Sequence, residues 1–85
     1  RRLRPAMPFN QRALVRAAAG APTIHLASSV LGSAVELPGP EAALLAELCV
    51  HGTQAAGPPA LAPLRQSLLA ERVPLLLRLG ALMAA

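Results

Sequence analysis

The stretch that decides the expected fold lies near the end of the chain and reads 61-LAPLRQSLLAERVPLLLRLGAL-82. Its leucines recur at steps of three, four and seven residues, which return to one side of an α-helix. Arg65, Arg72 and Arg78 fall mostly on other sides of that helix. The sequence therefore predicts a long apolar helical surface that must be covered. The stripe consists of Leu61, Leu64, Leu68, Leu75, Leu79 and Leu82.

A proline interrupts this stretch. Pro74 removes the hydrogen bond to the carbonyl of Ala70 and clashes with that carbonyl. The stretch is therefore predicted to form a kinked pair of helices, at about 63–72 and 74–84.

Upstream, turn-forming residues divide the chain into three further expected helices, at about 10–20, 23–35 and 40–51. Asn10 is a good N-cap for the first helix, and Gly20 stands where helices end. Thr23 can cap the second helix. The run 37-LPGP-40 then separates the second helix from the third, because proline and glycine favour turns.

The composition points to helices rather than sheets. The chain has 85 residues, enough for one domain, with one Phe and no Trp or Tyr. Leu and Ala, which dominate, favour helices, and β-branched residues are sparse. We therefore expect an all-α fold, a small irregular bundle of four to five short helices. Residues 1–9 should form a basic extended arm and residues 10–85 the helical module, because Pro5 and Pro8 disfavour helix in the residues before them.

The sequence carries no signature of an active site, and we expect no catalytic, metal or cofactor site. Cys49 and His51 are two residues apart, which places them on different faces of a helix. One cysteine and two histidines are too few for a zinc site within this chain. There is also no glycine-rich loop of the kind that binds phosphate.

The function expected instead is a non-catalytic scaffold module that docks into a multi-subunit assembly. A helix that is apolar nearly all round is buried on more than one side. The chain has more apolar helical surface near its end than a short bundle covers easily, so a protein partner should cover the rest. The predicted contact residues are Leu64, Leu68, Leu75, Leu76, Leu79 and Leu82, with Arg65, Arg72 and Arg78 as a polar rim.

The alternative function is contact with a nucleic-acid backbone. No acidic residue precedes Glu36, and the first two expected helices are spaced like a helix-turn-helix. The second of them lacks side chains that read base edges, so any contact would be to phosphate. The arginines that could touch phosphate or an acidic surface are Arg1, Arg2, Arg4, Arg12 and Arg16. A membrane-surface helix at 73–85 is a third use, weakened by its single charge, Arg78.

The cellular setting is constrained only loosely. The chain opens on Arg1 rather than Met, so we expect a fragment of a larger protein. A single cysteine cannot form an internal disulfide, which favours an intracellular location, the nucleus included. No stretch reaches the roughly 20 apolar residues of a membrane span.

Overall fold

The chain folds into strands as well as helices, so the predicted all-α bundle of four to five helices is wrong. The computed structural model describes residues 2–52 and 57–84. Its elements follow in the order β1 (Leu3–Pro5), α1 (Pro8–Ala18), β2 (Thr23–Ala27), β3 (Ala34–Pro38), α2 (Gly39–His51), the 3-10 turn η1 (Pro59–Leu61), α3 (Ala62–Ser67), the π-helical segment η2 (Leu68–Arg72), α4 (Val73–Arg78) and β4 (Leu82–Ala84).

The segment 23–35, predicted as a helix, instead forms most of an antiparallel pair of strands, β2 and β3. Ile24 and Leu26 are buried and alternate with more exposed neighbours, which is the two-residue period of a strand. Leu37, opposite Ile24 in the register, is buried as well. One face of this sheet therefore belongs to the core.

Residues 28–33, in the middle of the predicted helix, form the turn between β2 and β3. Val30 and Leu31 stay exposed in the turn, so they add nothing to a buried face. The Ser28 N–H donates to the Ser33 carbonyl at 2.7 Å and closes the turn. Gly32 has a φ of +65°, in the left-handed region that glycine adopts without steric cost.

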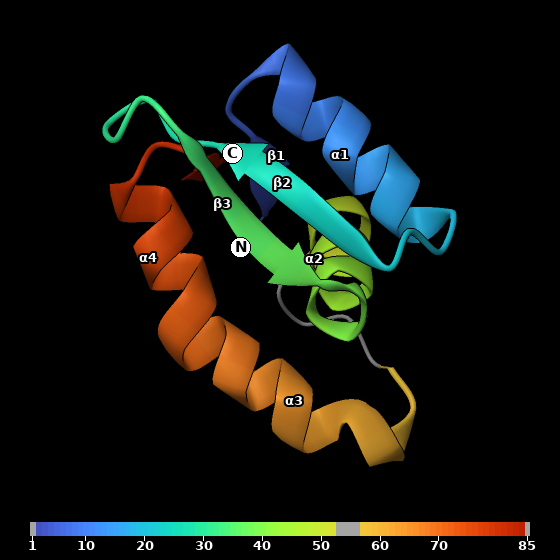
Figure 1. The fold of residues 1–85 in the computed structure, drawn as a ribbon. Coiled ribbons are helices and arrows are strands. Elements are labelled where there is room, and N and C mark those ends of the chain that lie inside the picture. Colours follow the sequence, from blue (N-terminus) through green and yellow to red (C-terminus); the bar gives the residue numbers. More distant parts are fainter. Residues whose placement is uncertain (1, 53–56, 85) are drawn as a thin grey trace.

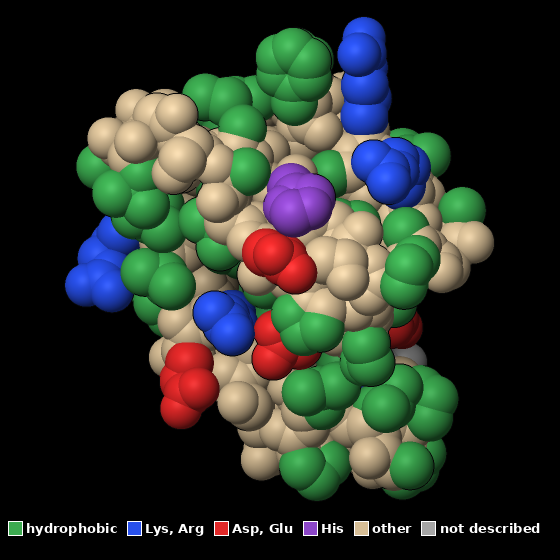
Figure 2. Space-filling view, viewed as in Figure 1, with side chains coloured by type: hydrophobic (Ala, Val, Ile, Leu, Met, Phe, Trp, Pro, Cys, Tyr) green, Lys and Arg blue, Asp and Glu red, His purple; other side chains and the backbone are tan. Residues whose placement is uncertain are grey.

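The other face of the β2–β3 sheet is open to solvent. His25 and Glu36 are partners in the register and both are exposed. Figure 2 shows a histidine and an acidic side chain side by side over this sheet. An antiparallel sheet with one solvated face alternates polar and apolar residues in this way.

The chain start is a strand rather than a free arm. β1 pairs antiparallel with β4, so that Leu3 lies opposite Ala84 and Pro5 lies opposite Leu82. Leu3 is only 2% exposed, which makes it part of the core. Residues 82–84, predicted to end the last helix, form the other strand of this pair. The two ends of the described chain therefore lie side by side (Figure 1).

The C-terminal helical run passes through Pro74 by means of a π-helical segment. In η2 the Val73 N–H donates to the Leu68 carbonyl, five residues back. Pro74 then falls in the first turn of α4, a position that tolerates proline. The buried side chains accordingly step by five residues from Leu68 to Val73, and then by three to Leu76.

A buried amide joins α1 to both pairs of strands. Asn10, expected as an N-cap, lies inside α1 and is 0% exposed. Its Nδ2 donates to the carbonyls of Ala27, at 3.1 Å, and of Ala81, at 2.9 Å. Its Oδ1 accepts from the Ala27 N–H. The amide thus connects the end of β2 with the residue that precedes β4.

The elements surround one apolar core. Figure 1 shows the β2–β3 sheet in front, α2 behind it, α1 along one side and the α3–α4 run along the other. Side chains from every layer meet in this core, because each sheet and helix has one apolar face to cover. The core includes Leu26, Leu37, Leu45, Leu48 and Leu76.

Candidate interaction site

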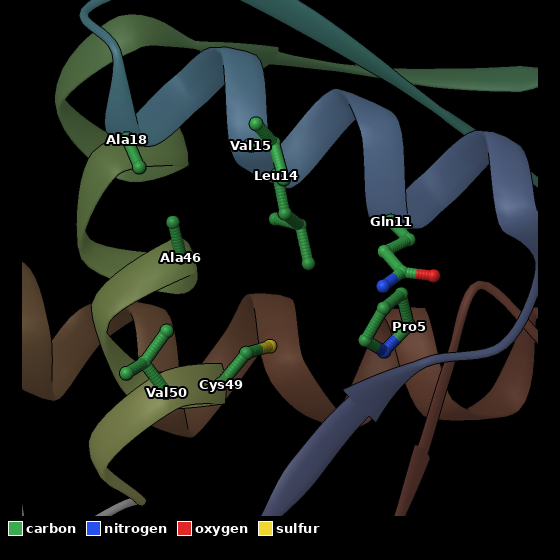
Figure 3. Close-up of a pocket in the computed structure, with 8 residues that line it drawn as sticks. All are labelled: Pro5, Gln11, Leu14, Val15, Ala18, Ala46, Cys49 and Val50. Atoms are coloured by element: carbon green, nitrogen blue, oxygen red, sulfur yellow. The ribbon is translucent and has the colours of Figure 1, made fainter.

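A small apolar pocket opens where α1, α2 and β1 meet. Its volume is about 260 Å³, and Figure 3 shows its side chains arranged around the space between the three elements. Gln11 supplies the one amide of the lining, and Cys49 supplies the one titratable group. The lining consists of Pro5, Gln11, Leu14, Val15, Ala18, Ala46, Cys49 and Val50.

The shape of the pocket depends on the sizes of the side chains that line it. Ala18 of α1 and Ala46 of α2 face each other in Figure 3 at the crossing of the two helices. Small side chains there let the helices approach. Leu14, which is 6% exposed, points from α1 into the space and joins the pocket to the core. Pro5 closes the side formed by β1. The pocket is therefore a direct result of how α1 packs across α2.

Two valines that line the pocket are exposed to solvent. Val15 is 65% exposed and Val50 is 62% exposed, although both are large apolar residues beside an apolar cavity. Covering each of them would gain about 1–2 kcal/mol, since full burial of such a side chain is worth about 1.5–3 kcal/mol. The pocket and its two valines thus form a continuous surface that another molecule could cover.

Cys49 lies in this pocket as an inert thiol. Desolvation by burial raises its pKa from 9.0 to about 11. The thiol is therefore protonated near neutral pH, whereas a cysteine nucleophile reacts as the thiolate. Its sulfur serves as a small apolar lining group, as buried free cysteines usually do.

Basic residues lie near the pocket. The Arg2 side chain donates a long hydrogen bond of 3.5 Å to the Val50 carbonyl, at the C-terminal end of α2. Arg12 and Arg16 are exposed on α1, on either side of Val15 in the sequence. Glu47 of α2 is the acidic residue nearest in sequence to the lining, and it is partly exposed. It points about 100° around the helix from Ala46.

The six leucines predicted to contact a partner divide into two groups. Leu68, Leu76 and Leu82 are 0–2% exposed, so in the folded chain they contact the core and not the surface. The other three, Leu64, Leu75 and Leu79, are partly exposed along the C-terminal helical run. Only this second group is placed where a partner could reach it, and its role in binding stays a prediction.

The three arginines of the predicted rim have different surroundings. Nε of Arg72 lies 3.4 Å from Oε2 of Glu41, which ties η2 to the start of α2. The guanidinium of Arg65 packs against Gly57. Arg78 is exposed at the end of α4. They are spread along the helical run and do not form one rim.

The predicted phosphate-binding arginines are also spread over two elements. Arg2 and Arg4 are exposed on or beside β1, and Arg4 lies 3.7 Å from the Met83 sulfur. Arg12 and Arg16 project from α1, while Arg1 lies outside the described residues. A helix-turn-helix is not formed, because the predicted second helix is the β2–β3 pair.

Other reactive residues do not gather into a site. Within residues 2–52 and 57–84, no group of three or more His, Cys, Asp or Glu side chains could share a metal ion. His25 and His51 are both exposed and belong to different elements. Among the described helices, none is long and apolar enough to cross a membrane.

The sequence had hinted at the pocket without defining it. Val15 and Ala18 are apolar and three residues apart, so the sequence places them on one face of a helix. The face of α1 that is buried runs instead through Asn10, Ala13, Leu14 and Ala17. The signal available in the sequence was that the apolar face of this helix is wider than the stripe of residues that the fold buries. The contributions of Pro5, Gln11 and Val50 had no local signal, because they depend on the meeting of α1, α2 and β1.

Comparison of the chain with protein families, with curated proteins and with solved structures found no significant match. The pocket and the surface around it are therefore the basis for a functional proposal.

Proposed function

We propose that this chain is a non-catalytic protein-interaction module that binds a partner in the pocket between α1, α2 and β1. The observation that supports this most directly is the exposure of Val15 and Val50 beside an apolar cavity. Isolated exposed apolar residues are common on proteins, but two of them that continue into a pocket make a contiguous patch. Such patches are typical of sites that bind another protein.

The chemistry of the pocket suits binding better than catalysis. A general base or a nucleophile needs a pKa near the working pH, but the titratable group of the lining is a thiol with a pKa of about 11. The Gln11 amide can donate and accept hydrogen bonds but does not titrate. The lining therefore offers shape, apolar contact and one polar anchor, which is the usual make-up of a recognition site.

The proposal is tested by selecting peptides from a random-sequence display library on the immobilised chain. We expect selected peptides to lose at least about tenfold in affinity when Val15→Glu places a charge beside the pocket, because a buried unpaired charge opposes binding. The matched control is His25→Glu on the open face of the β2–β3 sheet, which should leave the affinity unchanged. Both variants replace exposed side chains, so both should fold.

Two outcomes would contradict the proposal. One is a library that yields no binding peptide. The other is a set of peptides whose affinity is indifferent to Val15→Glu, since these would bind elsewhere on the chain. Sedimentation of the chain alone adds a further check, because association of two copies through the pocket would be disrupted by the same substitution.

A further inference from the structure

The solvent side of α1 carries a stripe of aromatic and basic side chains. Phe9, Arg12 and Arg16 are spaced by three and four residues, so they lie on one face of the helix. Phe9 is 67% exposed, and the Arg12 guanidinium carbon lies 5.8 Å from the centre of its ring. This distance is within the range of a cation–π contact, which holds the guanidinium beside an apolar surface.

The charged residues of α1 are all basic. No acidic residue precedes Glu36 in the chain, whose net charge is +4. Figure 2 shows basic side chains over α1, while the acidic side chains in this view lie farther down, over the sheet and the other helices. Glu41 is occupied by its ion pair with Arg72. The positive field of α1 is therefore not cancelled by carboxylates on the same helix.

The stripe and the pocket share α1. Val15 lines the pocket and lies between Arg12 and Arg16 in the sequence. Arg12 precedes Val15 by three residues and is its neighbour on the helix surface, whereas Arg16 lies about 100° around the helix from Val15, one turn along the stripe from Arg12. A molecule that covers Val15 and enters the pocket therefore passes beside Arg12 first and reaches Arg16 by extending along the stripe. The molecule that binds best there should be apolar where it faces the pocket and anionic where it faces the stripe, because electrostatic potentials across an interface are complementary.

Resting on the proposed function, we infer that the partner is an acidic amphipathic segment of a protein. Its apolar side chains cover Val15 and Val50 and fill the pocket, and its carboxylates pair with Arg12 and Arg16. A cavity of about 260 Å³ is smaller than the roughly 300–1,000 Å³ of pockets for drug-sized ligands, so it suits a side chain or two. A nucleic acid would match the arginines but would leave the apolar lining without a complementary group.

The test uses the charge of the peptides selected from the random-sequence library. We expect enriched sequences to combine bulky apolar residues with Asp and Glu. Replacing Arg12 and Arg16 by Gln should weaken an enriched acidic peptide about two- to fivefold per residue, the range of exposed ion pairs. The peptide's own Glu→Gln version should bind the unaltered chain with the same loss. Arg78→Gln, which changes an exposed arginine at the end of α4, is the matched control and should change nothing.

Each other outcome overturns a stated part of the argument. Enrichment of neutral apolar peptides that respond to Val15→Glu but not to the arginine changes would remove the acidic partner and leave the interaction module. Failure to enrich any peptide would remove both. A random-sequence single-stranded oligonucleotide that binds through the same arginines, and more tightly than every selected peptide, would assign the surface to nucleic acid instead.

Discussion

Replacement of Asn10 by Ala should be among the most destabilising single changes in this chain. The Asn10 amide is 0% exposed and is the group through which α1, β2 and the residue before β4 are hydrogen-bonded together. The substitution removes three hydrogen bonds. After it, the N–H and the carbonyl of Ala27 lose the bonds that Asn10 supplied, whereas the Ala81 carbonyl still accepts from the Ala6 N–H at 3.1 Å.

The magnitude follows from those lost partners. A fully buried polar group left unsatisfied costs about 1–3 kcal/mol, and the two Ala27 groups are partly buried, so together they predict a loss of about 2–3 kcal/mol. A chain of this length has a free energy of unfolding of about 4–13 kcal/mol. The variant should therefore lose a large share of its stability.

Urea unfolding followed by far-UV circular dichroism measures this loss, since a chain without Trp or Tyr offers little intrinsic fluorescence. The matched control is Gln11→Ala, which removes an exposed amide from the same helix and should change stability by no more than about 0.5 kcal/mol. A loss for Asn10→Ala as small as that of the control would refute the bridging role of this amide.

Changing Asn10 to Asp tests the same geometry through pH. The introduced carboxylate can still accept from the Ala27 N–H, but it faces the carbonyls of Ala27 and Ala81 without a proton to donate. Burial and these carbonyls should raise its pKa in the folded state above the unfolded value. The folded state then binds more protons, so this variant should gain stability as the pH falls through the folded pKa toward the unfolded value. Stability that instead rises with pH in this window would contradict the assigned contacts.

Three further predictions use other parts of the fold. Cys49 should react with iodoacetamide about a hundredfold more slowly near neutral pH than an unstructured cysteine, because a pKa of about 11 rather than 9.0 leaves about a hundredfold less thiolate; equal alkylation rates would show that the thiol is not desolvated. Leu76→Ala should cost about 2–5 kcal/mol in urea unfolding, since this side chain is 0% exposed, and a loss below about 1 kcal/mol would place it outside the core. Gly80→Ala should destabilise the chain more than Gly32→Ala, as both have positive φ but only at Gly80 would the new Cβ clash, with Ser29; equal losses in unfolding experiments would show that the site at Gly80 relaxes freely.

Local signals located part of the fold. The structure has helices at Pro8–Ala18 and Gly39–His51, close to the segments 10–20 and 40–51 marked by proline and glycine. These signals work because proline and glycine act on the backbone of their immediate neighbours. They do not depend on what the rest of the chain does.

In the β2–β3 hairpin, the spacing of apolar residues did not distinguish a strand from a helix. Ile24 and Leu26 fit the two-residue period of a strand, and together with Val30 and Leu31 they also fit helical steps. The sequence favoured a helix because the composition is rich in Leu and Ala. The structure buries the first two residues and exposes the other two, so packing against the helices decided between the two periods.

The candidate site was even harder to predict from the sequence. The leucine stripe predicted an apolar face, but the step of five residues in η2 rotates that face, so that Val73 and Leu76 are buried while Leu75 and Leu79 are partly exposed. The pocket needs β1, which exists only by pairing with β4 some 80 residues away. Three-residue strands carry no periodic signal that could be read.

The sequence by itself determined where the chain can turn, which segments are apolar and which end is basic, because these properties belong to single residues and their neighbours. Only the tertiary structure decided that 23–38 is a hairpin, that Asn10 bridges two pairs of strands, and that Val15 and Val50 meet at a pocket. Those features arise from contacts between residues far apart in the chain, whose free energy exists only once the layers have packed together.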